Sequence, residues 1–279
     1  MKTIKTVAIL MISMSFFASC KNSSSENVVK DDISNVQNLE NNSVSETSVG
    51  GVSEQINEAA KKNKAVFLVV FNKEGAEKEK TLSIAKEAAA KNPKTIQVIE
   101  LNTSDNANSE LVTKYRLTGA PLPLIIVLDK NGIAAGGLVL ADATVDGLLK
   151  IIPSPKYSEI LKALNNQKAI FIVVYKQTMP DKAKAIENCK KTVESMNNGA
   201  SVVELNIDNK NEEILITQLK VNTLATDPVI YAINKAGQVT GTFDINTSTA
   251  DLKNAANKVI KSSGCCPGGS GSSGCGTKK

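Results

Sequence analysis

The chain repeats itself at a spacing of 104 residues, and this repeat is the strongest constraint on its fold. Residues 64–71 (KAVFLVVF) match 168–175 (KAIFIVVY), and 98–102 (VIELN) match 202–206 (VVELN). A one-residue insertion then moves the match to 105. This spacing is too long for a solenoid unit and suits an ordinary domain of about 50 to 250 residues. We therefore expect one fold present twice.

Within each copy, apolar runs of strand length alternate with helical patterns. The first copy predicts helices over 53–63, 74–91, 109–116 and 144–151, and strands over 65–71, 95–101, 124–129 and 133–139. The second copy repeats this order from 157 to 261. The continuous apolar runs are typical of strands covered on both faces. Alternating strands and helices favour an α/β domain with a central sheet.

The first twenty residues have the features of an export signal. Lys2 and Lys5 precede an apolar run over 7–18 that is too short to span a membrane. The run ends in small residues before Cys20 (FASC), which resembles the lipobox of bacterial lipoproteins. The resemblance implies a signal peptide over 1–19 and a diacylglycerol on the Cys20 sulfur. The alternative is an ordinary cleaved signal peptide.

The composition divides the remaining chain into four parts. We expect a disordered tether over 20–52, which is rich in Ser, Asn and Glu and has no period. Two domains follow, over 53–153 and 154–262. The last part, 263–279, is a Gly/Ser-rich tail that should be flexible.

The segment before the third strand of each copy supports a family resemblance. Residues 115–123 (YRLTGAPLP) lead into LIIVLDKNG, and 226–228 (TDP) lead into VIYAINKAG. Pro123 and Pro228 each stand nine residues before a turn glycine. With the order of elements, this resembles the thioredoxin-like family, in which a cis proline precedes a buried strand.

The resemblance implies two tandem thioredoxin-like domains, each a central mixed sheet flanked by helices. It makes Pro123 and Pro228 the candidates for the cis proline and for contact with a bound peptide. Pro121 competes with Pro123 in the first copy, because its distance from Tyr115 also suits the family.

The redox motif of this family is missing from both copies. The family places one cysteine five residues after the aromatic that ends the first core strand, a second three residues later, and a buried acid just before that aromatic. The corresponding residues here are Ala76, Glu79 and Val70 in the first copy, and Pro180, Ala183 and Val174 in the second. A dithiol pair is needed for thiol–disulfide exchange. We therefore expect neither copy to perform it at the usual place, and we expect no cofactor.

The remaining cysteines have two different settings. Cys189 lies at helical spacing among apolar residues and matches Ala85 of the first copy, which predicts a packing position. Cys265, Cys266 and Cys275 lie in the tail and are weak candidates for catalysis or for soft-metal binding. A disulfide within the tail and a cysteine run without a role are the other interpretations.

Other functions are excluded by composition. The chain has no histidine, so Ser-His-Asp and Cys-His catalysis and histidine metal sites are ruled out. A net charge of +5, without a basic stripe, argues against nucleic-acid binding. Residues 77–80 (EKEK) are typical of a solvated helix face.

These features predict a lipid-anchored protein of the bacterial cell envelope whose two thioredoxin-like domains are redox-inactive and bind envelope polypeptides or partner proteins. Lys21, rather than aspartate, after Cys20 favours the outer membrane, on its periplasmic or surface face. The alternative function is a thiol–disulfide oxidoreductase or a soft-metal-binding protein that uses the tail cysteines.

Overall fold

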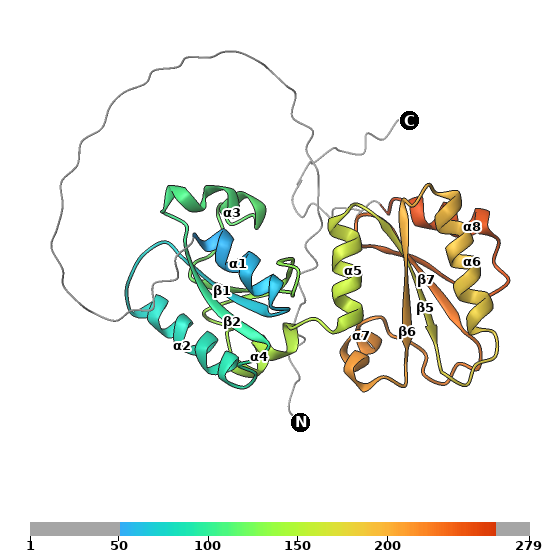
Figure 1. Ribbon diagram of the computed structural model, residues 1–279, viewed down its shortest axis with the longest axis horizontal. Coiled ribbons are helices and arrows are strands. Elements are labelled where there is room, and N and C mark those ends of the chain that lie inside the picture. Colours follow the sequence, from blue (N-terminus) through green and yellow to red (C-terminus); the bar gives the residue numbers. More distant parts are fainter. Residues whose placement is uncertain (1–50, 261–279) are drawn as a thin grey trace, which may run out of the picture. The chain divides into compact units, whose positions relative to one another are not determined.

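The computed structural model describes residues 51–260 (Figure 1). The expected signal peptide, Cys20, nearly all of the tether, and the tail with Cys265, Cys266 and Cys275 lie outside the described residues. Within 51–260, no helix has the length and apolar character needed to cross a membrane.

The first repeat is built on a four-stranded mixed sheet. Its strands are β1 (Ala65–Phe71), β2 (Ile96–Asn102), β3 (Leu124–Leu128) and β4 (Ala134–Val139), in the order β2-β1-β3-β4. β1 is parallel to β2 and antiparallel to β3, and β4 is antiparallel to β3. All seven residues of β1 are buried, as its apolar run predicts.

Helices cover both faces of this sheet. They are α1 (Val52–Lys61), α2 (Ala76–Ala90), α3 (Ser109–Lys114) and α4 (Val145–Ile151), with a short 3₁₀ helix, η1 (Asn106–Asn108), before α3. Successive side chains of β1 point to opposite faces. Val66, Leu68 and Val70 pack in one cluster with residues of α1 and α3. Phe67 and Val69 pack in a second cluster with residues of α2 and α4.

The second repeat has the same order of elements. Its strands are β5 (Ala169–Tyr175), β6 (Ala200–Asn206), β7 (Val229–Ile233) and β8 (Val239–Phe243), in the order β6-β5-β7-β8. Its helices are α5 (Pro155–Asn165), α6 (Lys182–Ser195), η2 (Lys210–Glu212), α7 (Glu213–Gln218) and α8 (Thr249–Asn257). Ala65 pairs with Ile96 and Ala169 pairs with Ala200, so the 104-residue spacing is kept in the registers.

This architecture confirms the predicted fold class of two mixed sheets flanked by helices. Two local expectations differ from the structure. The short helices before α3 and α7 were not predicted; Asp105 and Asn209 start them by accepting hydrogen bonds from the backbone two residues later. β2 was expected to be buried, but it is an edge strand and Glu100 on it is exposed.

The chain separates into two compact units that do not follow the repeats throughout. Within the described residues, one unit holds 51–166 and 207–223, and the other holds 167–206 and 224–260. The first sheet lies in the first unit together with α5 and α7, and the second sheet lies in the second unit with α6 and α8. In the second unit, the core between the sheet and α6 and α8 includes Phe171, Val173 and Leu252.

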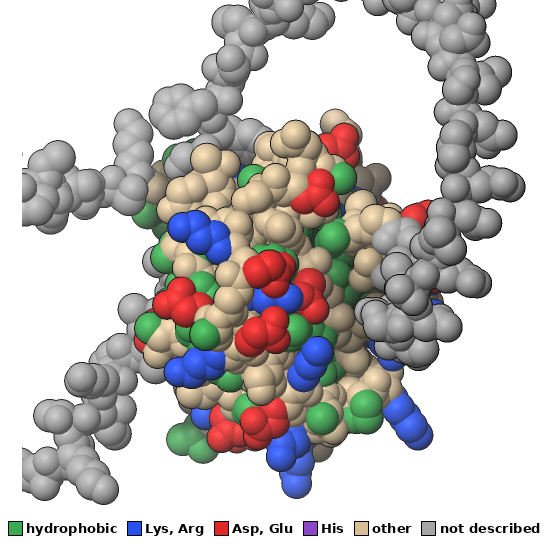
Figure 2. Space-filling model, turned by 90° about the vertical axis from the view of Figure 1, so that its left-hand side faces the viewer, with side chains coloured by type: hydrophobic (Ala, Val, Ile, Leu, Met, Phe, Trp, Pro, Cys, Tyr) green, Lys and Arg blue, Asp and Glu red, His purple; other side chains and the backbone are tan. Residues whose placement is uncertain are grey.

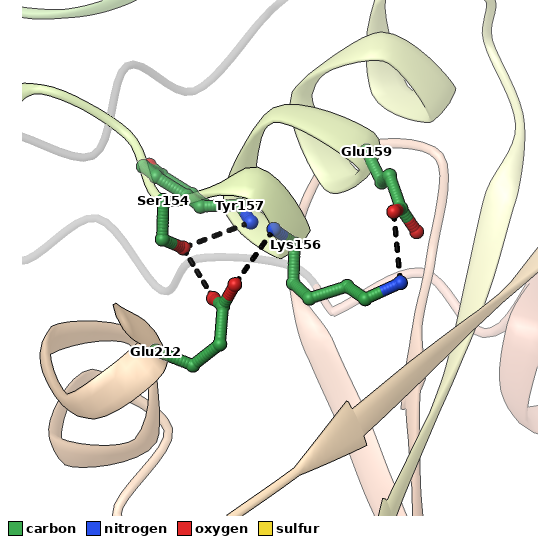
Figure 3. Close-up of polar contacts among 5 residues, drawn as sticks. All are labelled: Ser154, Lys156, Tyr157, Glu159 and Glu212. Atoms are coloured by element: carbon green, nitrogen blue, oxygen red, sulfur yellow. Dashed lines mark hydrogen bonds and ion pairs between the residues drawn. The ribbon is translucent and has the colours of Figure 1, made fainter. Parts of the chain in front are cut away.

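A buried carboxylate holds the start of α5 (Figure 3). Glu212, only 1% exposed, accepts hydrogen bonds from the Ser154 hydroxyl and from the Lys156 backbone N–H at 3.1 Å. The Ser154 oxygen in turn accepts from the Tyr157 N–H. The first N–H groups of a helix have no partner within it, and a nearby negative charge stabilises them. Glu212 therefore fixes α5 to η2 and has a structural role.

We predict that Glu212→Ala lowers the unfolding free energy by about 1–3 kcal/mol, because it leaves the Lys156 N–H and the Ser154 hydroxyl without their buried acceptor. Urea unfolding measures this change. Glu213→Ala removes the neighbouring exposed carboxylate and serves as the control, with an expected change within about 0.5 kcal/mol. Equal effects of the two variants would contradict the role given to Glu212.

Candidate functional site

The expected site of each repeat lies where the central strand ends and the next helix begins. In the first repeat, Phe71 ends β1 and Ala76 begins α2. The register pairs Val70 with Leu124, so Pro123, which precedes Leu124, lies beside the end of β1. The second repeat pairs Val174 with Val229 in the same way. We call these two places the first corner and the second corner.

The structure distinguishes the proline candidates. The Leu122–Pro123 peptide bond is cis, as expected for Pro123, and it is the one cis bond within residues 51–260, so Pro121 follows a trans bond. The cis expectation for Pro228 is wrong. The loop before Pro228 holds one residue more than the loop before Pro123, and its X–Pro bond has the trans form that such bonds ordinarily prefer.

The first corner holds a lysine among carboxylates. The Lys78 Nζ lies 2.7 Å from Glu100, 3.2 Å from Glu74 and 3.4 Å from Glu79. It also lies 5.0 Å from the centre of the Phe71 ring, within the range of a cation–π contact. Only 11% of its side chain is exposed. The expectation of a solvated face over 77–80 is therefore wrong for Lys78, because Glu100 on β2 draws its ammonium group toward the sheet.

The electrostatics of this network keep Lys78 charged. The hydrogen bond to Glu100, helped by the one to Glu74, raises the pKa of Lys78 above its ordinary value despite partial burial. A lysine with a raised pKa is a poor base and a poor nucleophile at neutral pH. Figure 2 shows acidic and basic side chains interleaved on one face of the molecule. The first corner therefore carries an ion-pair network that suits packing better than proton transfer.

The second corner repeats the lysine and the aromatic ring with fewer acids around them. Lys182 corresponds to Lys78, and its Nζ lies 5.9 Å from the centre of the Tyr175 ring. The Lys182 ammonium donates to the Gln177 carbonyl at 2.8 Å. Thr178 and Ala183 replace Glu74 and Glu79, so two of the three acids of the first corner are missing, and Glu204 corresponds to the third, Glu100. This lysine–aromatic pair was not predicted from the sequence. The repeat could have indicated it, because Lys182 lies 104 residues after Lys78 and Tyr175 lies 104 residues after Phe71.

The structure places the residues that replace the redox motif where the family resemblance expects them. Ala76 is the first residue of α2, and Glu79 follows on its first turn. Pro180 precedes α6, which begins at Lys182, so the second corner differs slightly in where its helix starts. Val70 and Val174 are 0% and 4% exposed among apolar side chains. Neither corner has a sulfur atom or a buried acid at these positions.

Cys189 is a packing residue, as expected. It is fully buried in α6, as its counterpart Ala85 is in α2. Burial raises the pKa of its thiol to about 12, which suppresses the reactive thiolate.

We predict that Cys189 resists a thiol reagent such as iodoacetamide until the protein unfolds, because its thiol is buried and protonated. Its folded pKa is above its unfolded value, so its contribution to stability is complete below about pH 9 and declines as the pH rises toward 12. Mass spectrometry of a variant in which Cys189 is the sole cysteine measures the labelling. Fast labelling of the folded variant would contradict a packing role.

A second buried carboxylate is also structural. Asp129, at the end of β3, accepts hydrogen bonds from the N–H groups of Asn131 and Ile133 and so closes the turn before β4. Tyr115 donates to the Gly132 carbonyl of the same turn. Burial, with a smaller effect of Asp129, raises the pKa of Tyr115 to about 12. Asn234 makes the equivalent turn in the second repeat, so the charge is not essential there.

Comparisons with known proteins concern the fold. No protein-family model and no curated protein matches the sequence. Among solved structures, the first two thioredoxin domains of Eps1p from Naumovozyma dairenensis are 13% identical, with 75% of this chain and 96% of that chain covered and a TM-score of 0.28. The NTD_N/C domain of alkylhydroperoxide reductase AhpF from Enterococcus faecalis is 13% identical, with 73% and 98% covered and a TM-score of 0.25. Human ERp44 is 8% identical, with 73% and 54% covered and a TM-score of 0.32.

Within residues 51–260, no three Cys, Asp or Glu side chains are grouped so that they could hold a metal ion. The tail cysteines, the weak candidates for that role, lie outside these residues. The order of elements in each repeat, and the order and directions of the strands in each sheet, match the fold that was expected of two tandem thioredoxin-like domains.

Proposed function

We propose that this protein is a lipid-anchored component of the bacterial cell envelope whose two thioredoxin-like domains bind extended polypeptides without exchanging electrons. The observation that carries the proposal is the double replacement of the redox residues, with Ala76 and Glu79 in one corner and Pro180 and Ala183 in the other. The first corner keeps its cis Pro123 beside the end of β1. Such a loop can present backbone groups to an extended chain.

The second corner offers an apolar contact as well. Leu224, in the loop before Pro228, is 86% exposed, the largest exposed fraction among the large apolar side chains that the structure describes. A lone exposed apolar side chain is common on protein surfaces, so Leu224 adds a contact that can be tested and does not carry the proposal. Fold analogy alone does not establish a function, so the proposal depends on the replaced redox residues of both corners.

The test measures binding of an unfolded, thiol-blocked polypeptide, reduced and carboxymethylated α-lactalbumin, to the full chain by fluorescence anisotropy. We expect micromolar affinity that is unchanged when Cys265, Cys266 and Cys275 are replaced by serine. Leu224→Asp should weaken binding severalfold, whereas Ile214→Asp, at an exposed position of α7, should not. No binding at high micromolar concentration would contradict the proposal.

The lipid anchor has a separate test. We expect mass spectrometry of the mature protein to find its N-terminus at Cys20, modified by diacylglycerol. The Cys20→Ser variant should leave the membrane fraction. An unmodified Cys20 in a protein that still fractionates with the membrane would contradict the anchor.

A further inference from the structure

A hollow of about 580 Å³ lies beside β8, and neither corner includes it. One wall is β8, through Thr240 and Phe243. The other wall is one face of α8 and its end, through Asp251, Asn254, Ala255 and Lys258, which follow at the three- and four-residue spacing of a helix face. Its volume is within the range of about 300–1,000 Å³ that is usual for ligand sites.

The strand that forms this wall is the last strand of its sheet. β8 pairs with β7 on one side, and no other strand of the described residues pairs with it. Its sequence, VTGTF, contains neither charge nor proline, two of the features that protect an edge strand from pairing. Its pairing with β7 shifts in register between Val239 and Gly241, so the regular part of this edge is Gly241–Phe243. Val239 at its start is 44% exposed. An extended chain could therefore add to this edge through backbone hydrogen bonds.

The hollow would then receive alternate side chains of the added chain. The ring of Phe243 and the methyl group of Ala255 give it an apolar middle. The side chains of Asn254 and Lys258 make no hydrogen bond or ion pair with the described residues. Main-chain pairing with an edge strand, combined with pockets for alternate side chains, is a recurrent way to bind peptides.

The charges at the two ends of the hollow are opposite. β8 leads through a loop into α8, which returns along it, so Asp251 near the start of α8 lies toward the Phe243 end. Lys258 lies toward the other end, since its carbonyl accepts from Asn234 and the next residues reach Gln238. A chain that runs antiparallel to β8 passes Asp251 first and Lys258 second. It fits best with a basic residue followed, a few residues later, by an acidic one.

The first domain has larger or differently shaped side chains at two of the corresponding positions. Ile151 takes the place of Ala255, and Leu138 that of Phe243, and both pack against the core cluster of the first sheet. The larger Ile151 side chain stands at the position where Ala255 lines the hollow of the second domain. The two copies have therefore diverged at this position.

We propose that the groove between β8 and α8 binds an extended polypeptide segment by antiparallel strand addition, with a basic residue near Asp251, a small apolar residue beside Phe243 and an acidic residue near Lys258. This inference rests on the proposed polypeptide-binding function and assigns it to a surface distinct from the corners.

The experiment titrates the isotope-labelled full chain with the capped heptapeptide Thr-Lys-Thr-Val-Thr-Glu-Thr and follows the backbone amides by NMR. We expect the shift changes to concentrate on β8 and α8. The charge-swapped peptide Thr-Glu-Thr-Val-Thr-Lys-Thr should bind severalfold more weakly. Asn254→Trp should fill the groove and reduce the affinity about tenfold or more. Asn257→Trp, an exposed position of α8 outside the groove, is the matched control.

Shift changes confined to residues near Pro123 or Leu224, or equal affinities for the Asn254→Trp variant and the original chain, would overturn the groove assignment. If Asn254→Trp alters the fold, Lys258→Glu replaces it; the expected result is loss of preference between the two peptides. Binding of carboxymethylated α-lactalbumin to the Asn254→Trp variant separates the two proposals. If the Asn254→Trp variant binds both the heptapeptide and carboxymethylated α-lactalbumin as the original chain does, the groove fails and the proposed function survives; if the original chain binds neither probe, both fail.

Discussion

Val70→Asp should lower the unfolding free energy of the first domain by about 3 kcal/mol or more. Val70 is fully buried and packs with leucine and isoleucine side chains, so an introduced carboxyl would find no hydrogen-bond partner there. The thioredoxin-like family resemblance places a buried acid at this position, and this protein has an apolar side chain instead. Urea unfolding, followed by hydrogen exchange of the β1 amides, measures the change.

Val174→Asp is the matched variant in the second domain, where Val174 is 4% exposed and a similar loss is expected. Val70→Ala is the control for lost packing and should cost less, since it buries no polar group. If both aspartate variants were as stable as the original chain, both corners would still accommodate a buried acid. The claim that neither corner keeps the environment of a redox-active site would then be wrong.

The double substitution Ala76→Cys with Glu79→Cys should give the first corner a reactive dithiol. Both positions lie on the first turn of α2, three residues apart, so the two side chains are neighbours on one face. A helix N-terminus stabilises the thiolate, so we expect the first introduced thiol to have a pKa below the ordinary value of about 8.5. The variant should reduce insulin disulfides in a background whose native cysteines are replaced, with alanine at position 189.

Pro180→Cys with Ala183→Cys is the comparison in the second domain. α6 begins at Lys182, so the first introduced thiol would precede the helix. We expect slower insulin reduction than in the first-domain variant. The cysteines introduced at positions 76 and 79 should form a disulfide on mild oxidation. If they do not, the geometry at the start of α2 differs from that of a redox-active thioredoxin-like site, and the missing cysteines are not the whole difference.

The sequence predicted most of the fold because the repeat supplied each element twice. The uninterrupted apolar run predicted β1 at its observed bounds, and the 104-residue spacing carries those bounds onto β5. Thr144 was expected to begin α4, where it accepts a hydrogen bond from the Gly147 N–H. The two 3₁₀ helices were missed because a three-residue helix has no period. β2 was taken for a buried strand because its apolar content does not show that it lies at an edge.

The site was harder to predict, because its contacts join residues far apart in the chain. Lys78 looked solvated beside its sequence neighbours, but its partner Glu100 comes from another strand. Glu212 holds Ser154, which is 58 residues earlier. Pro228 fits the spacing of the family pattern, yet the extra loop residue before it changes how the chain enters β7. The position of Cys189 was predictable because its counterpart Ala85 marked a small buried space.

The most direct measurement compares disulfide reduction with polypeptide binding in the same full-length preparation. The original chain should reduce insulin no faster than buffer containing the same reductant, and it should bind carboxymethylated α-lactalbumin with micromolar affinity. Replacement of Cys265, Cys266 and Cys275 by serine should change neither result. Two results would contradict the proposal that the thioredoxin-like domains bind polypeptides without exchanging electrons. One is insulin reduction by the original chain that is lost in the triple variant. The other is an original chain that binds no unfolded polypeptide.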